Sequence, residues 1–202
     1  MFYRVSTRAL DILIVLISLP IVVPIVSIFS LLIYFDDPGS VIFTQKRLGK
    51  NKAIFNMYKL RKFRCNESSN GRAVTLSDDD RFTKVGKFIE KSKIDELPQF
   101  YNILIGNMSF VGPRPITMFF ADAYENSYHD LFKFRPGVFG PNQVKYRNEG
   151  EVLAQKKNPE KFYRDFLVKD KAERDILFFN NISLYDYLSI LFKGIFSVIF
   201  VR

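Results

Sequence analysis

Two adjacent carboxylates, and an arginine held between two prolines, are the residues of this chain best suited to chemistry. Asp95 and Glu96 stand near the expected start of a helix, where the helix dipole and the free backbone N–H groups favour negative charge. Arg114 follows within Gly112-Pro113-Arg114-Pro115, where the prolines stiffen the backbone that carries its guanidinium. A guanidinium fork binds phosphate or carboxylate through paired hydrogen bonds. Together these residues predict an acid pair that faces a phosphorylated substrate.

The helix that carries the acid pair is expected to begin near Ser92–Asp95, where Ser-x-x-Asp resembles a capping box. Pro98 fits within its first turn, and Gly106 is expected to end it. Its buried stripe would consist of Leu97, Phe100, Tyr101 and Leu104. Taken on this helix alone, the residues favour ordinary negative charge at a helix N-terminus over a catalytic acid pair, and both interpretations stay open.

The composition narrows the possible chemistry and the possible partners. The chain has 202 residues, 48% of them hydrophobic, which favours one compact domain over disorder. A net charge of +9 indicates an anionic partner: nucleic acid, a phosphorylated small molecule or an acidic membrane surface. Cys65 and His129 are the only cysteine and histidine, so acid–base work falls to carboxylates, lysines or tyrosines. Nucleic acid is excluded as a partner because no helix-turn-helix or RNP-type motif is present.

Residues 12–34 form an uncharged segment long enough to cross a bilayer. The segment exceeds the roughly 7–15 apolar residues of a signal peptide, and basic residues lie on both of its sides. Pro20 and Pro24 interrupt the helix, and Ser18 could bond to the backbone groups that they free. A hinge there would return both ends to the cytoplasmic face, but the residues alone favour a single kinked span.

The rest of the chain predicts an α+β, mostly helical fold. A hairpin is expected around residues 49–51, and the run from Val41 to Arg64 holds eight basic residues and no acidic one. Helices are expected at 83–91, 116–134 and 149–171, with an irregular segment after Gly140. An amphipathic helix at 184–201 would lie on the membrane. We therefore expect a membrane helix in residues 1–35 and a small globular cytoplasmic domain with amphipathic interfacial helices in residues 36–202.

The order of these motifs resembles the monotopic phosphoglycosyl transferases, the bacterial sugar transferases that begin lipid-linked glycan assembly. The resemblance covers nearly the whole chain, and its three main blocks are residues 95–99, 108–115 and 135–137. A lone Asp-Glu pair would be weak evidence, whereas DELPQ, MSFVGPRP and RPG in this order are highly specific. Further matching positions are Arg8, Asp11, Phe43, Gln45, Arg47, Gly49, Lys59, Arg61, Arg81, Thr83, Gly86, Asn102, Gly140, Gln143, Arg147 and Asp186.

The resemblance implies a two-step reaction at the cytoplasmic face of the bacterial inner membrane. In that family the Asp of the dyad attacks the β-phosphorus of a UDP-sugar, UMP leaves, and polyprenyl phosphate takes the phospho-sugar from the enzyme. Asp95 stands at the nucleophile position with Glu96 beside it, and Mg²⁺ is the implied cofactor, with Asp95 touching it. The candidates for phosphate binding are Lys59, Arg114, Arg147 and Arg135, the last of which could simply brace its turn. Membrane lipid and downstream glycosyltransferases are the other implied partners.

The resemblance also changes the expectation for the membrane segment. In the family this segment is a re-entrant helix broken at a Ser-Pro pair, and Pro24 falls on that proline. Val23 stands where the serine would be, so Ser18 and Pro20 are candidates for a substitute break. A re-entrant helix is thus favoured over a spanning one.

Two departures from the family pattern bear on activity. Glu90 stands where arginine is usual, five residues before Asp95, and Asn107 stands where aspartate is usual. Lys87, Lys91 or Lys93 could offset the charge of Glu90. These departures are compatible with a different UDP-sugar or with reduced activity. The alternative function is a catalytically silent membrane scaffold of the same fold, against which the intact acid pair argues.

Overall fold

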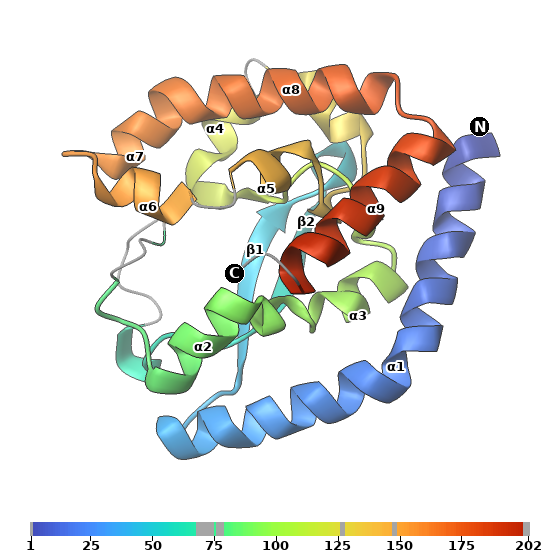
Figure 1. Ribbon diagram of the computed structural model, residues 1–202. Coiled ribbons are helices and arrows are strands. Elements are labelled where there is room, and N and C mark those ends of the chain that lie inside the picture. Colours follow the sequence, from blue (N-terminus) through green and yellow to red (C-terminus); the bar gives the residue numbers. More distant parts are fainter. Residues whose placement is uncertain (1, 68–74, 76–78, 126–127, 147–148, 200–202) are drawn as a thin grey trace.

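The protein arranges nine α-helices and two small sheets in the part of the chain that the computed structural model describes, residues 2–67, 75, 79–125, 128–146 and 149–199 (Figure 1). The helices are α1 (Phe2–Asp36), α2 (Lys84–Ser92), α3 (Gln99–Leu104), α4 (Ala121–Glu125), α5 (Pro141–Lys145), α6 (Glu149–Ala154), α7 (Pro159–Phe162), α8 (Val168–Asn180) and α9 (Leu184–Ile199). The strands are β1 (Ile42–Leu48), β2 (Ile54–Leu60), β3 (Ser109–Val111), β4 (Ile116–Thr117) and β5 (Gly137–Phe139). The expected mostly helical fold with some sheet is confirmed.

Helix α1 consists of two limbs that meet at a bend (Figure 1). Pro20 and Pro24 both lie inside it, and proline kinks a helix because it removes an amide donor and crowds the preceding turn. The hydroxyl of Ser18 donates to the carbonyl of Val15 at 2.9 Å. The carbonyl that Pro20 leaves without a donor is that of Leu16, four residues earlier, because proline has no amide hydrogen. Ser18 therefore does not supply the expected bond to a freed carbonyl.

One face of α1 packs on the domain and the other is left exposed. Within the described residues, Thr7–Asp36 is the one helical stretch long and apolar enough to cross a membrane, with a mean hydropathy of 3.0. Its inner side contacts α2, α3 and α9. Its exposed apolar side chains are Leu13, Leu16, Ile17, Ile21, Val23, Ile28, Leu31, Leu32, Tyr34 and Phe35. An apolar surface of this extent indicates contact with a membrane rather than with water.

The expected hairpin is confirmed as β1 and β2, which pair antiparallel through a tight turn at Lys50–Lys52. Strand β4 adds to the other edge of β1, so the sheet has the order β2-β1-β4. Alternate side chains of β2, Phe55 and Met57, point into the main core. That core also contains Val15, Ile103, Met108, Phe110, Val111, Phe179, Tyr187, Ile190 and Leu191.

Strands β3 and β5 form a second, parallel sheet that brings two glycines into direct backbone contact. A Cβ on Gly112 would lie 2.2 Å from the carbonyl oxygen of Arg135, and one on Gly137 would lie 2.0 Å from the nitrogen of Gly112. Only glycine permits so close an approach. The Gly112–Pro115 turn is thereby fastened to the Arg-Pro-Gly turn, with a further bond of 2.9 Å from the amide of Gly137 to the carbonyl of Pro113.

The acid pair does not open a helix through a capping box, so that expectation was wrong. Ser92 is the last residue of α2, which ends because Lys93 adopts a left-handed conformation (φ 60°). Asp95 and Glu96 lie in η3, a short 3₁₀ turn over Ile94–Glu96, and α3 begins only after Pro98. The expected stripe is confirmed only at Phe100, which packs on the main core; Tyr101 and Leu104 are exposed, and the buried residues of α3 are Gln99, Asn102 and Ile103. A turn closed on both sides by backbone constraints holds the acids more rigidly than a fraying helix end would.

A buried carboxylate joins the membrane helix to the C-terminal helix. Asp11 of α1 is 1% exposed and accepts hydrogen bonds from the Ser109 hydroxyl at 2.9 Å and the Phe110 amide at 3.0 Å. It also accepts one from the hydroxyl of Tyr187 in α9. Because three donors from two other elements converge on it, Asp11 fixes α1 and α9 against β3.

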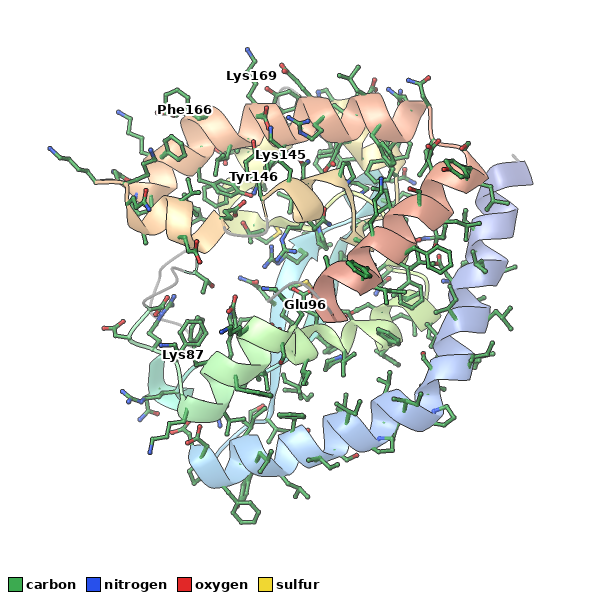
Figure 2. The ribbon with its side chains drawn as sticks, viewed as in Figure 1. Lys87, Glu96, Lys145, Tyr146, Phe166 and Lys169 are labelled. Atoms are coloured by element: carbon green, nitrogen blue, oxygen red, sulfur yellow. The ribbon has the colours of Figure 1, made fainter. Side chains whose placement is uncertain are left out.

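Several expected elements differ in detail. Residues 116–134 contain β4, α4 and short 3₁₀ turns instead of one helix, and α5 occupies the expected irregular segment after Gly140. Pro141 starts α5 at a position where proline is favoured. The expected helix at 149–171 is divided into α6, α7 and α8, with a π-helical turn at Tyr163–Leu167. Within that turn, the side chain of Phe166 is 63% exposed and points outward in Figure 2, whereas the neighbouring Leu167 is buried.

Asp175 in α8 makes the stability of the fold depend on pH. It is 4% exposed, and burial raises its pKa to about 7. Between pH 4 and pH 7 the folded protein therefore keeps a proton on Asp175 that the unfolded chain has released. The contribution of Asp175 to the free energy of unfolding is complete below pH 4 and is lost as the pH rises through about 7. We expect Asp175→Asn, which needs no proton, to gain up to ~4 kcal/mol relative to wild type between pH 4 and pH 8. Thermal melting at both pH values tests this; an equal difference at the two would contradict it.

Candidate active site

The hairpin and α3 together place Lys59. The side-chain amide of Asn102, which is fully buried, donates to the carbonyl of Asn56 at 2.7 Å and accepts from the amide of Tyr58 at 3.1 Å. It therefore makes the two hydrogen bonds to the backbone of β2 that a neighbouring strand would make at this edge of the sheet. Lys59 follows directly, and its ammonium projects toward the acid turn. The match of Asn102 to the family pattern thus has a structural reason.

Lys59 contacts both acids, but not equally. Its Nζ lies 2.7 Å from Oε1 of Glu96 and 3.6 Å from Oδ2 of Asp95. Asp95 is 2% exposed, and its Oδ1 has no hydrogen-bond partner among the described residues. Figure 2 shows Glu96 near the centre of the molecule. The pair therefore consists of one firmly bound carboxylate and one loosely held one.

Burial and the neighbouring charges push the two acids in opposite directions. Burial raises the pKa of Asp95, and the charge of Glu96 adds to the rise, while Lys59 opposes it. Burial would raise the pKa of Glu96 as well, but Lys59 and Arg114 outweigh that effect and lower it far below its usual range. Glu96 is thus permanently charged and holds the cations, whereas Asp95 is the member whose charge responds to its surroundings.

The Pro-Arg-Pro turn brings Arg114 to the acid pair. Its guanidinium lies 3.8 Å from Glu96 and remains half exposed, so it is available to a ligand. Arg47 of β1 holds this turn by donating to the carbonyl of Pro115 at 3.0 Å and to Gln45 at 2.6 Å. Next to it, β1 and β4 pair in register. Arg114 is therefore positioned by a neighbouring strand as well as by its prolines.

These side chains border a small hollow that is open to solvent. It is lined by Arg47, Met57, Lys59, Glu96, Gln99, Arg114, Pro115, Gly137 and Val138. Three cations and one carboxylate around a hollow can bind a phosphorylated ligand, with Asp95 directly beside Glu96. The structure thus brings together Asp95, Glu96, Lys59 and Arg114 as the sequence predicted.

Two other predicted phosphate ligands are not placed at this hollow. Arg135 has Arg8 and Asp11 as its charged neighbours; burial and Arg8 lower its pKa. Its backbone carbonyl lies in the close contact with Gly112, so its position favours the bracing role over phosphate binding. Arg147 lies outside the described residues.

Glu90 is accommodated by lysines, which was one of the open expectations. Lys93 lies 3.3 Å from Oε1 of Glu90, and both side chains are partly exposed. Lys62, at the end of the hairpin, is a second positive neighbour of Glu90, and burial lowers the pKa of Lys62 to about 8. The positive charges of Lys93 and Lys62 therefore offset the negative charge of Glu90.

The donor set fits a magnesium ion only if a substrate completes its shell. No cluster of three or more potential metal-binding side chains exists within the described residues. Asp95 Oδ1 is a buried acceptor that the described protein groups leave unpaired, and Mg²⁺ is usually held by one or two carboxylates together with substrate phosphates. The site thus fits an ion that arrives with a diphosphate rather than one caged by the protein.

The sequence motifs did not single out Arg47 and Gln99 as site residues, or Lys62 as a nearby cation. Gln99 belongs to a block of the family resemblance and Arg47 is one of its further matching positions, and that membership was the available signal. Lys62 is one lysine in a long basic run, and nothing in the sequence distinguishes it from its neighbours. Its place beside Glu90 depends on how α2 packs on its backbone, where a Cβ on Gly86 would lie 1.8 Å from the carbonyl oxygen of Lys62.

Comparison with known proteins identifies the family of this chain. The family described as bacterial sugar transferase matches residues 2–201. A putative undecaprenyl-phosphate N-acetylgalactosaminyl 1-phosphate transferase of Bacillus subtilis is 38% identical over 150 residues, which are 74% of this chain and 83% of that protein. A UDP-N-acetylgalactosamine-undecaprenyl-phosphate N-acetylgalactosaminephosphotransferase of Aeromonas hydrophila is 34% identical over 98% of this chain and 44% of its own length. The UDP-glucose:undecaprenyl-phosphate glucose-1-phosphate transferase of Escherichia coli is 32% identical over 81% of this chain, but this chain spans only 36% of it.

Proposed function

Because the chain belongs to the bacterial sugar transferase family, we propose that it transfers a phospho-sugar from a UDP-sugar to a polyprenyl phosphate at a membrane. The observation that carries the proposal is the buried, loosely held carboxylate of Asp95. Its neighbour Glu96 holds Lys59 and Arg114 beside it. Relatives named for transfer to undecaprenyl phosphate make that lipid the expected acceptor. The product would begin assembly of a lipid-linked glycan.

In the first step an oxygen of Asp95 attacks the β-phosphorus of the UDP-sugar. The new bond joins the carboxylate oxygen to phosphorus, the bond from that phosphorus to the oxygen bridging to the α-phosphate breaks, and UMP leaves with the bridging oxygen. In the second step an oxygen of polyprenyl phosphate attacks the same phosphorus, which frees Asp95 and gives polyprenyl-diphospho-sugar. A carboxylate nucleophile divides one difficult displacement into two easier ones.

The residues around Asp95 have separate tasks in this proposal. Lys59 and Arg114 bind the phosphate oxygens, and Arg47 keeps the turn of Arg114 in place. Glu96 orients Lys59 and Arg114 by its charge, since its own pKa is too low for proton transfer near neutral pH. A bound Mg²⁺ would offset the charges of the diphosphate and of Asp95 and stabilise the departing UMP.

UMP release with a panel of UDP-sugars tests this function against the silent scaffold. Purified protein with Mg²⁺ and polyprenyl phosphate is expected to release UMP from at least one sugar. N-acetylgalactosamine and glucose donors belong in the panel because of the relatives' names. A folded protein that releases no UMP across a broad panel would favour the scaffold instead.

We further propose that α1 is re-entrant, so that both of its ends lie on the cytoplasmic face of the inner membrane. The bend of α1 and its exposed apolar side support this topology (Figure 1). The exposed Phe192 and Phe196 of α9 would rest on the same membrane surface.

Single cysteines report the topology. In a Cys65→Ser background, Arg4→Cys and Lys46→Cys are expected to react with an impermeant thiol reagent only when the cytoplasmic face is accessible. Labelling of the two positions from opposite faces would overturn the re-entrant arrangement.

A further inference from the structure

The hollow beside the acid pair is lined by one polar side chain that the proposed mechanism leaves unused, that of Gln99. The charged side chains of the lining all have protein partners. Lys59 and Arg114 pair with Glu96, and Arg47 donates to the backbone of the Pro-Arg-Pro turn. The side chain of Gln99, in contrast, makes no hydrogen bond to any residue that the structure describes. Its amide is therefore free to bind a ligand.

The amide of Gln99 is nearly enclosed although it has no partner. The residue is 3% exposed. The fully enclosed side-chain atoms that lack a partner include Oδ1 of Asp95 but neither amide atom of Gln99, so the little exposure that remains includes its amide. A buried amide without a hydrogen bond opposes folding, and such groups usually bind protein, ordered water or a ligand. Because Gln99 lines the hollow, its partner has to enter there.

The backbone places Gln99 on the same side as the acid pair. Leu97 and Pro98, which connect the acid turn to α3, both have right-handed helical backbone angles. Along a helical path, side chains three or four residues apart lie on one face, with about 5–6 Å between their Cβ atoms. Asp95 and Gln99 are four residues apart, and both are almost fully buried. A group that Asp95 attacks from the hollow would therefore also lie within reach of the Gln99 amide.

The surroundings of Gln99 favour a phosphoryl oxygen as its partner. Three cations and one carboxylate line the hollow, and this excess of positive charge selects an anionic ligand. An amide N–H can donate to a phosphoryl oxygen without adding a charge. A fourth cation at this position would bind the carboxylate of Asp95 more strongly than a neutral donor does. The neutral amide therefore leaves Asp95 freer to attack phosphorus.

We propose that Gln99 is a further catalytic residue, whose amide N–H donates a hydrogen bond to a non-bridging oxygen of the phosphoryl group that Asp95 attacks. The same phosphorus reacts in both steps, first with Asp95 and then with polyprenyl phosphate. A donor fixed at its non-bridging oxygen stabilises the charge of both transition states. Gln99 itself forms and breaks no covalent bond. The inference rests on the proposed function and adds a neutral donor to Lys59 and Arg114.

The two half-reactions, measured separately, test this assignment. Gln99→Met removes the donor and keeps an unbranched side chain of similar length. It is expected to slow UMP release from the UDP-sugar about 10²-fold, which is the usual effect of losing one such donor. Transfer from the phospho-sugar enzyme, formed beforehand by long incubation, to polyprenyl phosphate is expected to slow about as much.

An exposed glutamine supplies the matched control. Gln155→Met makes the same chemical change in the turn after α6 and should leave both rates within about twofold. Rates for Gln99→Met within threefold of wild type would overturn the assignment. Slowing of the first half-reaction alone would place the amide on the departing UMP, and slowing of the second alone would place it on the lipid phosphate. Either result would also overturn it.

Binding and stability add measurements that need no turnover. With Mg²⁺ present, Gln99→Met is expected to weaken the binding of UDP about 3- to 10-fold, the effect of one hydrogen bond, in titration calorimetry. UMP lacks the β-phosphoryl group, so its binding should change less than twofold. The melting temperature without ligand should equal or exceed that of wild type, because an unpaired buried amide is removed. A clearly lower melting temperature would assign the amide a structural partner and overturn the inference.

The proposed function and the role of Gln99 can fail separately. A folded wild type that neither binds UDP nor releases UMP would refute the function and the inference together. A wild type that does both, while Gln99→Met matches it in UDP binding and in both half-reactions, would overturn the role of Gln99 alone.

Discussion

Replacing Asp95 by asparagine is expected to lower UMP release by at least about 10³-fold, which is the typical result of removing a nucleophile. Asparagine has nearly the same shape, so the turn at Ile94–Glu96 and the contacts of Glu96 should persist. Burial raises the pKa of Asp95, which means that its charge is unfavourable to folding. We therefore expect the melting temperature to stay the same or rise, so the loss of activity would not reflect unfolding.

A surface carboxylate gives the matched control for that substitution. Asp122 pairs with Arg164 at the exposed surface, far in sequence from the acid turn. Asp122→Asn makes the same chemical change and should leave UMP release within about twofold, because surface pairs contribute little. Retention of more than a tenth of the wild-type rate by Asp95→Asn would exclude it as the nucleophile.

Replacing Asp11 by alanine is expected to cause the largest loss of stability. Asp11 accepts from Ser109, Phe110 and Tyr187, and all of these donors are buried. Alanine would remove the acceptor that these three donors share, at roughly 1–3 kcal/mol per group, so a total of at least ~3 kcal/mol is expected. For a chain of this length that corresponds to a fall in melting temperature of about 6–12 °C.

The opposite end of the same helix supplies the control for Asp11→Ala. Asp36 accepts one bond, from the amide of Val85 at 2.9 Å, in an exposed setting. Asp36→Ala is expected to cost less than ~1.5 kcal/mol. Similar melting temperatures for the two variants would show that the buried carboxylate does not join α1, β3 and α9.

Patterns in the sequence predicted those parts of the fold that depend on local chemistry. The hairpin follows from alternating strand residues on either side of a glycine turn, and α2 follows from the spacing of Val85, Phe88 and Ile89. The acid turn was mistaken for a helix start because Ser-x-x-Asp satisfies a capping pattern. The left-handed Lys93 that ends α2 has no signature in the sequence.

The site was predicted as far as its residues belong to family motifs. Lys59, Asp95, Glu96 and Arg114 lie together as expected from the motifs that contain them. Arg135 was assigned by its motif as well, but its motif serves a backbone contact between two turns. The contact of Arg47 with the turn of Arg114 could not be predicted, because it depends on the pairing of β1 with β4, and that is a tertiary property.

The most direct test of the account is the intact mass of the protein after incubation with a UDP-sugar and Mg²⁺ in the absence of polyprenyl phosphate. The account predicts that the mass rises by one phospho-sugar, that peptide mapping places the addition on Asp95, and that polyprenyl phosphate then removes it. The Asp95→Asn variant should show no addition under the same conditions. Release of UMP by wild type without any such addition, or an addition on another residue, would contradict the central claim that Asp95 carries the phospho-sugar.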